Sequence, residues 1–168
     1  VLEPIRHHSV IQRMVQVHNQ TDVVLELDLT TLEAPFPWVL SCPQTAVEQS
    51  LEAHYQALGG RLVRGAELVD FQQDNERVDA RVRCTGEDGP WNVECAFLVG
   101  CDGAHSTVRK SLGISFDGVQ YPEHFLLADL DIEWSLSRDS SHVFLLPEGI
   151  LVALPLPEGW RLILNQSM

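Results

Sequence analysis

One helical segment between two short apolar segments constrains the fold of this chain more than any other feature. In "PQTAVEQSLEAHYQALGG", Thr45 and Glu48 have capping-box spacing, and Gly59 and Gly60 supply the stop at the C-terminal end. The apolar positions that share one face at helical spacing are Val47, Leu51, His54, Tyr55 and Leu58. Because "WVLSC" precedes this helix and "GGRLVRG" follows it, the order predicts a βαβ unit, which places its strands in a parallel sheet.

The remaining segments predict short strands separated by turns. Residues 9–18 and 22–29 predict a hairpin around the polar turn "HNQTD". "AELVDFQQ", "RVDARVRCT" and "WNVECAFLVG" predict a meander, whose final "CAFLVG" is expected to join the parallel sheet. In the last third, "FLLADLDIEW" alternates through Trp134, and "HVFLLPEG", "ILVALPLPEG" and "WRLILNQ" follow with tight turns. This pattern is typical of an antiparallel sheet, so we predict an α+β chain with a partial parallel sheet and an antiparallel one.

The composition argues against several classes of function. Eleven basic and twenty-four acidic residues give a net charge of −13, which disfavours nucleic acid and anionic membrane surfaces as partners. No run approaches the ~20 apolar residues that a membrane span needs. Residues 1–20 contain no apolar block of the kind found in a signal peptide.

The cysteines and histidines indicate a reduced, metal-free protein. No cysteine pair has the spacing of a zinc knuckle or redox motif; the four are Cys42, Cys84, Cys95 and Cys101. Reduced core thiols in a cytoplasmic protein are therefore expected. His7 and His8 are adjacent and would point to opposite faces of a strand, and neither they nor His18 have an acid or cysteine at ligand spacing, so no metal site is expected.

The segment "FLVGCDGAHSTVRKSLG", residues 97–113, carries the strongest indication of a ligand. Gly103 permits a sharp turn and a close backbone approach, and a helix that opens at Ser106 presents N–H groups suited to a diphosphate. Asp102 can accept hydrogen bonds, and Arg109 can reach back to the loop or touch a phosphate. Taken singly, these residues read as a common turn, a common N-cap and an exposed helix arginine. Their combination in this order is what indicates a binding site.

"GCDGAHSTVR" resembles the second fingerprint of the group A flavoprotein monooxygenases, the para-hydroxybenzoate hydroxylase-like aromatic ring hydroxylases. The fingerprint has Asp-Gly, two residues, Ser, two residues and Arg, and Asp102, Gly103, Ser106 and Arg109 match it. The resemblance implies that these residues serve FAD and NAD(P)H. "SCPQTAVEQSLEAHYQALGG" resembles the family's middle region and places Gln44 where the family has a flavin-contacting Gln. On the residues alone, Gln44 reads as a helix N-terminal residue without a ligand.

The resemblance covers roughly residues 30–134, and two family features are missing. This sequence has no glycine-rich strand–turn–helix for the ADP part of FAD and no later Gly-Asp motif. The chain is therefore expected to be an internal part of such an enzyme, which is α/β when complete. We expect residues 1–30 to supply strands of the substrate domain, 31–113 part of the FAD-binding domain, and 114–168 the antiparallel substrate-binding sheet.

The resemblance also implies a reaction. NAD(P)H reduces FAD, and the reduced flavin captures O₂ as a C4a-hydroperoxide that passes one oxygen to an aromatic or polyketide-like substrate. The cofactor carries this chemistry, so no catalytic side chain is named, and this piece alone is expected to be inactive. In the family the substrate lies against the antiparallel sheet, which points to its inward faces and to Ile11–Val17.

Two other functions fit the residues. One is a non-catalytic antiparallel-sheet module that binds an aromatic or lipid-like ligand, and the other is a flavin reductase or halogenase of the same fold. The expected βαβ piece would belong to a parallel sheet whose first strands lie upstream of Val1, and strand edges that lack those partners would recruit other chains. Self-association is therefore expected, through a region that includes Val39, Leu62 or Leu98.

Overall fold

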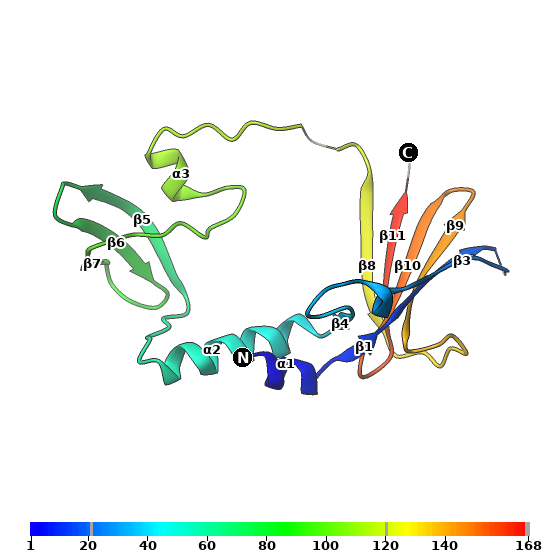
Figure 1. Cartoon of the computed structure of the whole chain (residues 1–168). Coiled ribbons are helices and arrows are strands. Elements are labelled where there is room, and N and C mark those ends of the chain that lie inside the picture. Colours follow the sequence, from blue (N-terminus) through cyan, green and yellow to red (C-terminus); the bar gives the residue numbers. More distant parts are fainter. Residues whose placement is uncertain (21, 120, 167–168) are drawn as a thin grey trace. The chain divides into compact units, whose positions relative to one another are not determined.

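The internal contacts divide the chain into two units, Val1–Gly60 with Tyr121–Met168, and Arg61–Gln120. The computed structural model describes residues 1–20, 22–119 and 121–166 (Figure 1). It combines a few helices with several sheets, so the predicted α+β class is confirmed. No helix of the described residues is long and apolar enough to cross a membrane. The assignment of residue ranges to FAD-binding and substrate-binding domains stays a prediction.

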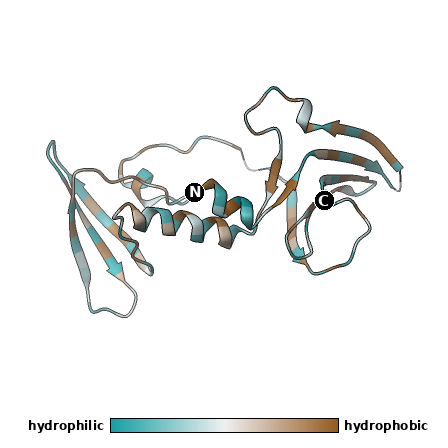
Figure 2. Ribbon diagram, turned by 60° about the horizontal axis from the view of Figure 1, so that its bottom comes forward, coloured by the Kyte–Doolittle hydropathy of each residue, from teal (hydrophilic) through white to brown (hydrophobic). Residues whose placement is uncertain are grey.

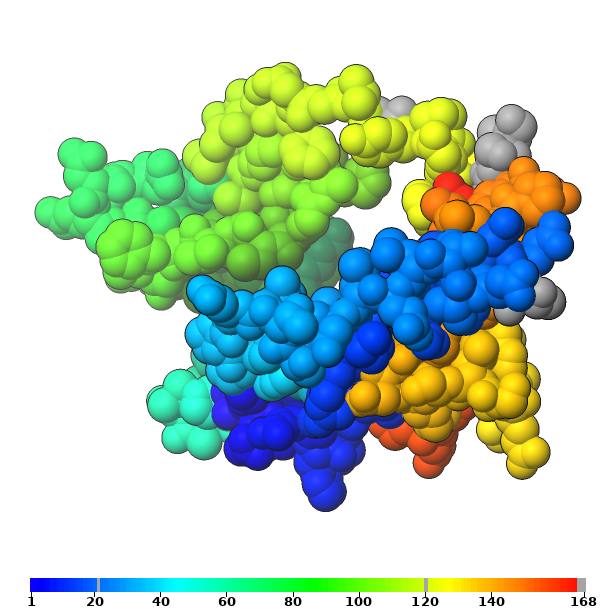
Figure 3. Space-filling model, turned by 45° about the vertical axis from the view of Figure 1, so that its right-hand side comes forward, coloured from blue at the N-terminus to red at the C-terminus, as the bar shows by residue number. Residues whose placement is uncertain are grey.

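A six-stranded sheet of the first unit contains the predicted antiparallel hairpins. Its spatial order is β3-β2-β9-β10-β11-β8. The strands are β2 (Met14–Asn19), β3 (Asp22–Asp28), β8 (His124–Leu130), β9 (Ser140–Leu146), β10 (Gly149–Pro155) and β11 (Trp160–Gln166). All neighbours run antiparallel except β2 and β9, which pair in parallel. Figure 3 shows the result, with blue residues of the N-terminal strands against orange residues near the C-terminus.

β8 is shorter than its sequence pattern predicts. The alternation was expected to continue through Asp131, Glu133 and Trp134, but the strand ends at Leu130. Its partner β11 begins opposite that residue, at Trp160, so the next residues have no neighbouring strand to pair with. Strand pairing, rather than side-chain alternation, therefore sets this end.

The segment predicted as one strand over residues 9–18 is divided at Arg13. β1 (Val10–Gln12) pairs antiparallel with β4 (Val39–Ser41), whereas β2 joins the six-stranded sheet. The N–H groups of Arg13 and Met14 both donate to the Asp139 carbonyl, at 2.8 and 3.2 Å, which anchors the break.

A buried glutamine connects the two-stranded sheet to β9. Gln12 is fully buried, and its amide donates to the Ser41 hydroxyl and accepts from the Ser141 hydroxyl. Among the described residues, no buried side-chain nitrogen or oxygen lacks a hydrogen-bond partner. The polar groups at this junction are therefore satisfied, as burial requires.

The long helix is present, but its cap differs from the prediction. Two helices, α1 (Leu2–His7) and α2 (Gln44–Ala57), lie in the first unit, together with the short 3₁₀ turn η1 (Leu29–Thr31). The predicted capping box at Thr45 and Glu48 is wrong, because Pro43 is the N-cap and no side chain caps the helix. None of its residues is buried, and the expected apolar face is largely exposed at Leu51, Tyr55 and Leu58.

The expected parallel pairing around α2 is not found in the part of the chain that the structure describes. β4 pairs antiparallel with β1, and residues 61–64 and 97–100 form no strand. Phe97 is 87% exposed and Val99 is 77% exposed, so neither side chain is packed in the interior of a sheet. An extended segment becomes a strand only where a neighbour satisfies its backbone groups.

The second unit is the predicted meander followed by the short helix. Its elements are β5 (Ala66–Gln73), β6 (Val78–Cys84), β7 (Pro90–Cys95) and α3 (Thr107–Ser111). The three strands pair antiparallel in the order β5-β6-β7. Along β6, Val78, Ala80 and Cys84 are buried while the intervening residues are not. Figure 2, coloured by hydropathy, shows apolar and polar residues mixed along the strands.

Candidate functional site

The Asp-Gly segment folds into a hydrogen-bonded loop centred on Asp102. One carboxylate oxygen accepts from the Ser106 hydroxyl at 2.5 Å. The other accepts from the backbone N–H of Thr107 at 2.6 Å and of Val108 at 3.3 Å. The Ser106 hydrogen bond is the largest cause that lowers the pKa of Asp102, and the backbone donors lower it further against the opposing effect of desolvation. The carboxylate is thus held in its charged form.

Ser106 is the N-cap of α3, as predicted. Its hydroxyl oxygen accepts from the Arg109 N–H at 3.0 Å while its proton goes to Asp102. The side chain is buried, and the preceding turn is closed by a 3.1 Å bond from the Ser106 N–H to the Gly103 carbonyl. Gly103 has φ +71°, a left-handed conformation in which glycine has no steric penalty.

Arg109 reaches back to the loop, which is one of the two roles that the sequence suggested. Its guanidinium donates to the Ala104 carbonyl at 2.9 Å and lies 4.5 Å above the Phe116 ring. Gly100, at the other end of the loop, is required for packing, since a Cβ there would lie 2.8 Å from the Val108 Cβ. The structure thus brings four of the five predicted site residues, Asp102, Gly103, Ser106 and Arg109, into one loop.

This geometry changes the expected chemistry of the α3 N-terminus. The sequence suggested that free N–H groups there suit a diphosphate, but the Asp102 carboxylate already accepts from Thr107 and Val108. A fixed negative charge at that position also repels a phosphate. The loop therefore offers side-chain and carbonyl groups, rather than helix N–H groups, to a ligand.

The fifth predicted residue, Gln44, begins α2 in the first unit. Its side chain is exposed and no side chain caps the helix. The first bond of the helix runs from the Ala46 N–H to the Pro43 carbonyl at 3.0 Å, so the N–H groups of Gln44 and Thr45 precede it. A cavity of about 480 Å³ adjoins this helix end, and its walls come from four parts of the unit. It is lined by His7, His8, Pro43, Thr45, Ala46, Asp129, Leu156, Pro157 and Glu158. Sequence reasoning missed the wall at 156–158, because no local pattern relates that turn to α2.

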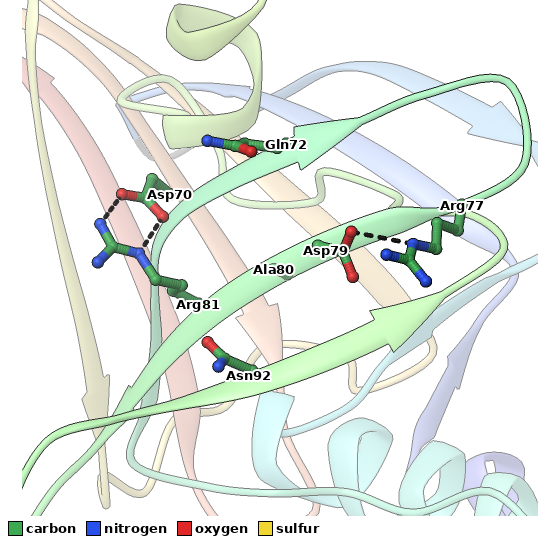
Figure 4. A pocket seen from close by; sticks show the side chains of 7 residues that line it. All are labelled: Asp70, Gln72, Arg77, Asp79, Ala80, Arg81 and Asn92. Atoms are coloured by element: carbon green, nitrogen blue, oxygen red, sulfur yellow. Dashed lines mark hydrogen bonds and ion pairs between the residues drawn. The ribbon is translucent and has the colours of Figure 1, made fainter.

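A larger hollow, of about 580 Å³, lies on the polar face of the three-stranded sheet (Figure 4). Its charged groups are already paired with each other. Arg81 binds both oxygens of Asp70, and Arg77 lies 3.1 Å from Asp79. Because the ion pairs are exposed and internally neutralised, this surface offers no unsatisfied charge to a ligand, and we do not assign the site to it.

The cysteines are all free, as expected. Cys84 is buried, whereas Cys101 is exposed beside the Asp-Gly turn, so the prediction of core thiols is wrong for Cys101. In the described ranges, no group of three or more His, Cys, Asp or Glu side chains is arranged to hold a metal ion.

Comparison with known proteins relates the sequence and the fold of this chain to FAD-binding proteins. The family described as "FAD binding domain" matches residues 1–148. The chain is 37% identical over 134 residues to 12-dehydrotetracycline 5-monooxygenase/anhydrotetracycline 6-monooxygenase of Streptomyces rimosus, an alignment that covers 79% of this chain. The chain spans about a quarter of the length of that relative, 26%.

Solved structures share the fold. Anhydrotetracycline hydroxylase from Streptomyces rimosus superimposes with a TM-score of 0.71 at 30% identity, over 98% of this chain and 33% of the other. The p-nitrophenol 4-monooxygenase of Pseudomonas putida superimposes with a TM-score of 0.88 at 20% identity, over 99% of this chain and 43% of the other, which shows the fold alone. Since the family match extends over most of the sequence and the fold agrees, the chain belongs to the FAD binding domain family.

Proposed function

We propose that this chain is part of a flavin-dependent monooxygenase that hydroxylates an aromatic or polyketide-like substrate with NAD(P)H and O₂. The observation that carries the proposal is the loop of Asp102, Gly103, Ser106 and Arg109, which is closed by its own hydrogen bonds in a chain of the FAD binding family. The named activities of the relatives, tetracycline monooxygenases among them, support the reaction class.

The residues present fit FAD in two places. The start of α2 leaves the exposed Gln44 side chain and the N–H groups of the first helical residues available for hydrogen bonds to the polar chain of the cofactor. In the fingerprint loop, Asp102 and Arg109 would act through the turn that they hold, because Asp102 already occupies the α3 donors. Bound FAD supplies the redox chemistry with O₂, and the protein positions it and excludes water.

The six-stranded sheet is the proposed substrate surface. In register, Val17, Val143 and Val152 lie beside one another on one face, and Leu25 and Ile163 extend the same row. Such a broad aliphatic face suits a flat apolar ring system, because burial of apolar surface stabilises the complex by about 25 cal/mol per Å².

NAD(P)H as the reductant, a cytoplasmic location and self-association of this chain belong to the same proposal. Asp102, Gly103, Ser106 and Arg109 are the residues proposed to serve both FAD and NAD(P)H. The domain division that follows assigns 1–30 and 114–168 to the substrate side and 31–113 to the cofactor side.

The proposal is tested in the full-length enzyme by flavin titration. Gln44→Ala is expected to weaken FAD binding about tenfold, the loss of one or two polar contacts, without unfolding the protein. Gln49→Ala, which removes an exposed glutamine from the same helix, is the matched control. An unchanged FAD dissociation constant for Gln44→Ala removes this residue from the site.

The reaction class is tested by substrate-dependent turnover. A monooxygenase consumes NAD(P)H and O₂ together when its aromatic substrate is present. NAD(P)H oxidation without O₂ uptake indicates a reductase. A full-length protein that is purified without bound FAD contradicts the proposal.

A further inference from the structure

The aliphatic sheet face proposed to bind the substrate ends in one ion pair. Asp129 of β8 lies opposite Arg161 of β11 in the antiparallel register. Ile163, which belongs to the aliphatic row, is two residues from Arg161 on the same strand, and residues two apart share a face. The Nε of Arg161 donates to Oδ1 of Asp129 at 2.8 Å, and its Nη2 donates to Oδ2 at 2.9 Å. The pair therefore borders the aliphatic row, and its bidentate contact fixes the orientation of the carboxylate.

The carboxylate of this pair is charged and accessible. The hydrogen bond from Arg161 is the largest cause that lowers the pKa of Asp129, and desolvation opposes it. The Asp129 side chain is 46% exposed, whereas that of Arg161 is 22% exposed. A carboxylate has about four lone-pair positions, and Arg161 uses one on each oxygen. Asp129 can therefore accept a further hydrogen bond from a ligand while Arg161 balances its charge.

Asp129 also lines the cavity of about 480 Å³ beside α2. The other titratable side chains of its lining are His7, His8 and Glu158, and none of the described lining residues is a lysine or an arginine. Arg161 balances Asp129 from outside the lining, but Glu158 adds a negative charge that no permanently positive lining residue offsets. An anionic ligand group would be repelled here, whereas a hydroxyl or amino group finds carboxylate acceptors.

The aliphatic face and the cavity are continuous at Asp129, which belongs to both. A flat molecule whose rings lie on Ile163 and its neighbours therefore places one edge at the cavity. Contact with an aliphatic face is non-directional, so by itself it does not select which edge of the ring system that is. A hydrogen bond to the oriented carboxylate makes this selection, because it requires a donor at one particular edge.

We propose that Asp129 is a specificity-determining residue of the substrate site, which accepts a hydrogen bond from a hydroxyl or amino group at one edge of a flat ring system and disfavours a ring system that carries a carboxylate there. This inference rests on the proposed function. Arg161 is a positioning residue, because it orients the Asp129 carboxylate and does not line the cavity. The contact decides which edge of the substrate faces the cavity, and hence which ring carbon is presented for hydroxylation.

The experiment measures the binding of three probes to the full-length enzyme by titration calorimetry. Naphthylmethanol, naphthylmethylamine and naphthoate, all substituted at the same ring carbon, share one flat ring system and differ only in the group at its edge. In the wild type, the dissociation constant of naphthoate is expected to exceed those of the alcohol and the amine about tenfold, as the loss of a hydrogen bond to a charged group predicts.

Asp129→Asn tests the role of the carboxylate. The substitution removes the negative charge and leaves Arg161 without its partner, so the order of the probes is expected to reverse. Naphthoate should bind about tenfold more tightly than to the wild type, and the amine about tenfold more weakly. Asp70→Asn is the matched control, because Asp70 accepts from Arg81 in the same bidentate way on the three-stranded sheet, and it should keep the wild-type order.

Several outcomes overturn the inference. They are equal dissociation constants for naphthoate and the alcohol in the wild type, no binding of any probe, or wild-type values in Asp129→Asn. If Asp129→Asn weakens all three probes alike, the carboxylate is merely structural and the inference is also wrong. If that variant does not fold, Glu158→Gln decides. It removes the second negative charge of the cavity without breaking the ion pair and should tighten naphthoate about threefold, and an unchanged value overturns the inference.

These outcomes are distinguishable from a failure of the proposed function. Bound FAD and the joint consumption of NAD(P)H and O₂ are measured without the probes. A full-length enzyme that shows both but does not discriminate between the probes overturns only the role of Asp129.

Discussion

At the scale of single residues, the buried pair of His18 and His142 is the most informative feature outside the candidate site. His142 is fully buried, and its Nε2 lies 2.8 Å from the Ser137 carbonyl, so this nitrogen carries a proton and donates. Its Nδ1 then accepts from Nε2 of His18, at 3.0 Å. Desolvation is the main cause that lowers the pKa of His142, and the nearby His18 lowers it further against the Ser137 hydrogen bond.

This pair predicts a pH-dependent stability. A histidine with a lowered pKa in the folded state takes up its proton more readily when unfolded. The free energy of unfolding should therefore fall as the pH drops from about 7 to about 5, below the ordinary histidine pKa of about 6.5. Chemical denaturation at several pH values checks this, and His142→Gln, which keeps a donor for Ser137 without titrating, should show a flatter dependence. His124→Gln, at an exposed histidine of β8, is the control. If the free energy of unfolding falls equally with pH in the wild type and in His142→Gln, the prediction is contradicted.

A second residue-scale prediction concerns the cap of α3. Ser106→Ala removes the acceptor of the Arg109 N–H and the donor to Asp102, and should cost about 1 kcal/mol, as N-cap losses do. Hydrogen exchange at α3 amides should accelerate accordingly. Ser111→Ala, at the exposed far end of the same helix, should have little effect. The capping role fails if both variants exchange alike.

At the scale of elements, the β10–β11 hairpin depends on one glycine. Gly159 has φ +76°, and a Cβ there would lie only 2.0 Å from the Leu130 carbonyl oxygen, which belongs to the neighbouring β8. The close approach lets Trp160 pair with both Pro155 and Leu130. The turn between β10 and β11 and the end of β8 are thus set by the same backbone contact.

Gly159→Ala should destabilise the protein by more than its backbone conformation alone explains. A left-handed alanine costs about 1–2 kcal/mol, and the clash adds about 1–3 kcal/mol as overpacking does. Gly86→Ala is a matched control, because Gly86 has φ +84° and nothing within 4 Å of its Cβ position. The difference between the free energies of unfolding of the two variants, measured in urea, gives the cost of the clash, because both variants share the backbone cost. A Gly159→Ala variant no less stable than Gly86→Ala refutes the contact.

At the scale of the whole molecule, exposed apolar surface on a strongly acidic chain predicts salt-dependent self-association. Val39 is 44% exposed and Leu62 is 46% exposed, while the net charge is −13. Repulsion between like charges opposes association, and salt screens it over a Debye length of about 10 Å at 0.1 M. Light scattering should therefore give a mass above 18.8 kDa that grows with salt and protein concentration. Val39→Asp should reduce the mass measured by light scattering. A constant monomer mass under all conditions disproves this.

Features that depend only on neighbouring residues could be predicted from the sequence. β5 begins and ends where its pattern predicts, at Ala66 and Gln73, and the hairpins of the last third follow from period-two alternation and Pro-Gly turns. The cap at Ser106 was also readable, because N-cap preference is a local hydrogen-bonding property.

The pairing of distant segments, in contrast, could not be predicted and follows from the folded arrangement. The parallel contact of β2 with β9, the pairing of β4 with β1 and the junction of His18 with His142 join residues that no local pattern relates. The folded arrangement also determines that Asp102, rather than a ligand, occupies the α3 donors. The physical reason is that strand edges and buried polar groups accept any partner that satisfies them, so the choice depends on which arrangement buries the most apolar surface and satisfies the most hydrogen bonds across the folded chain.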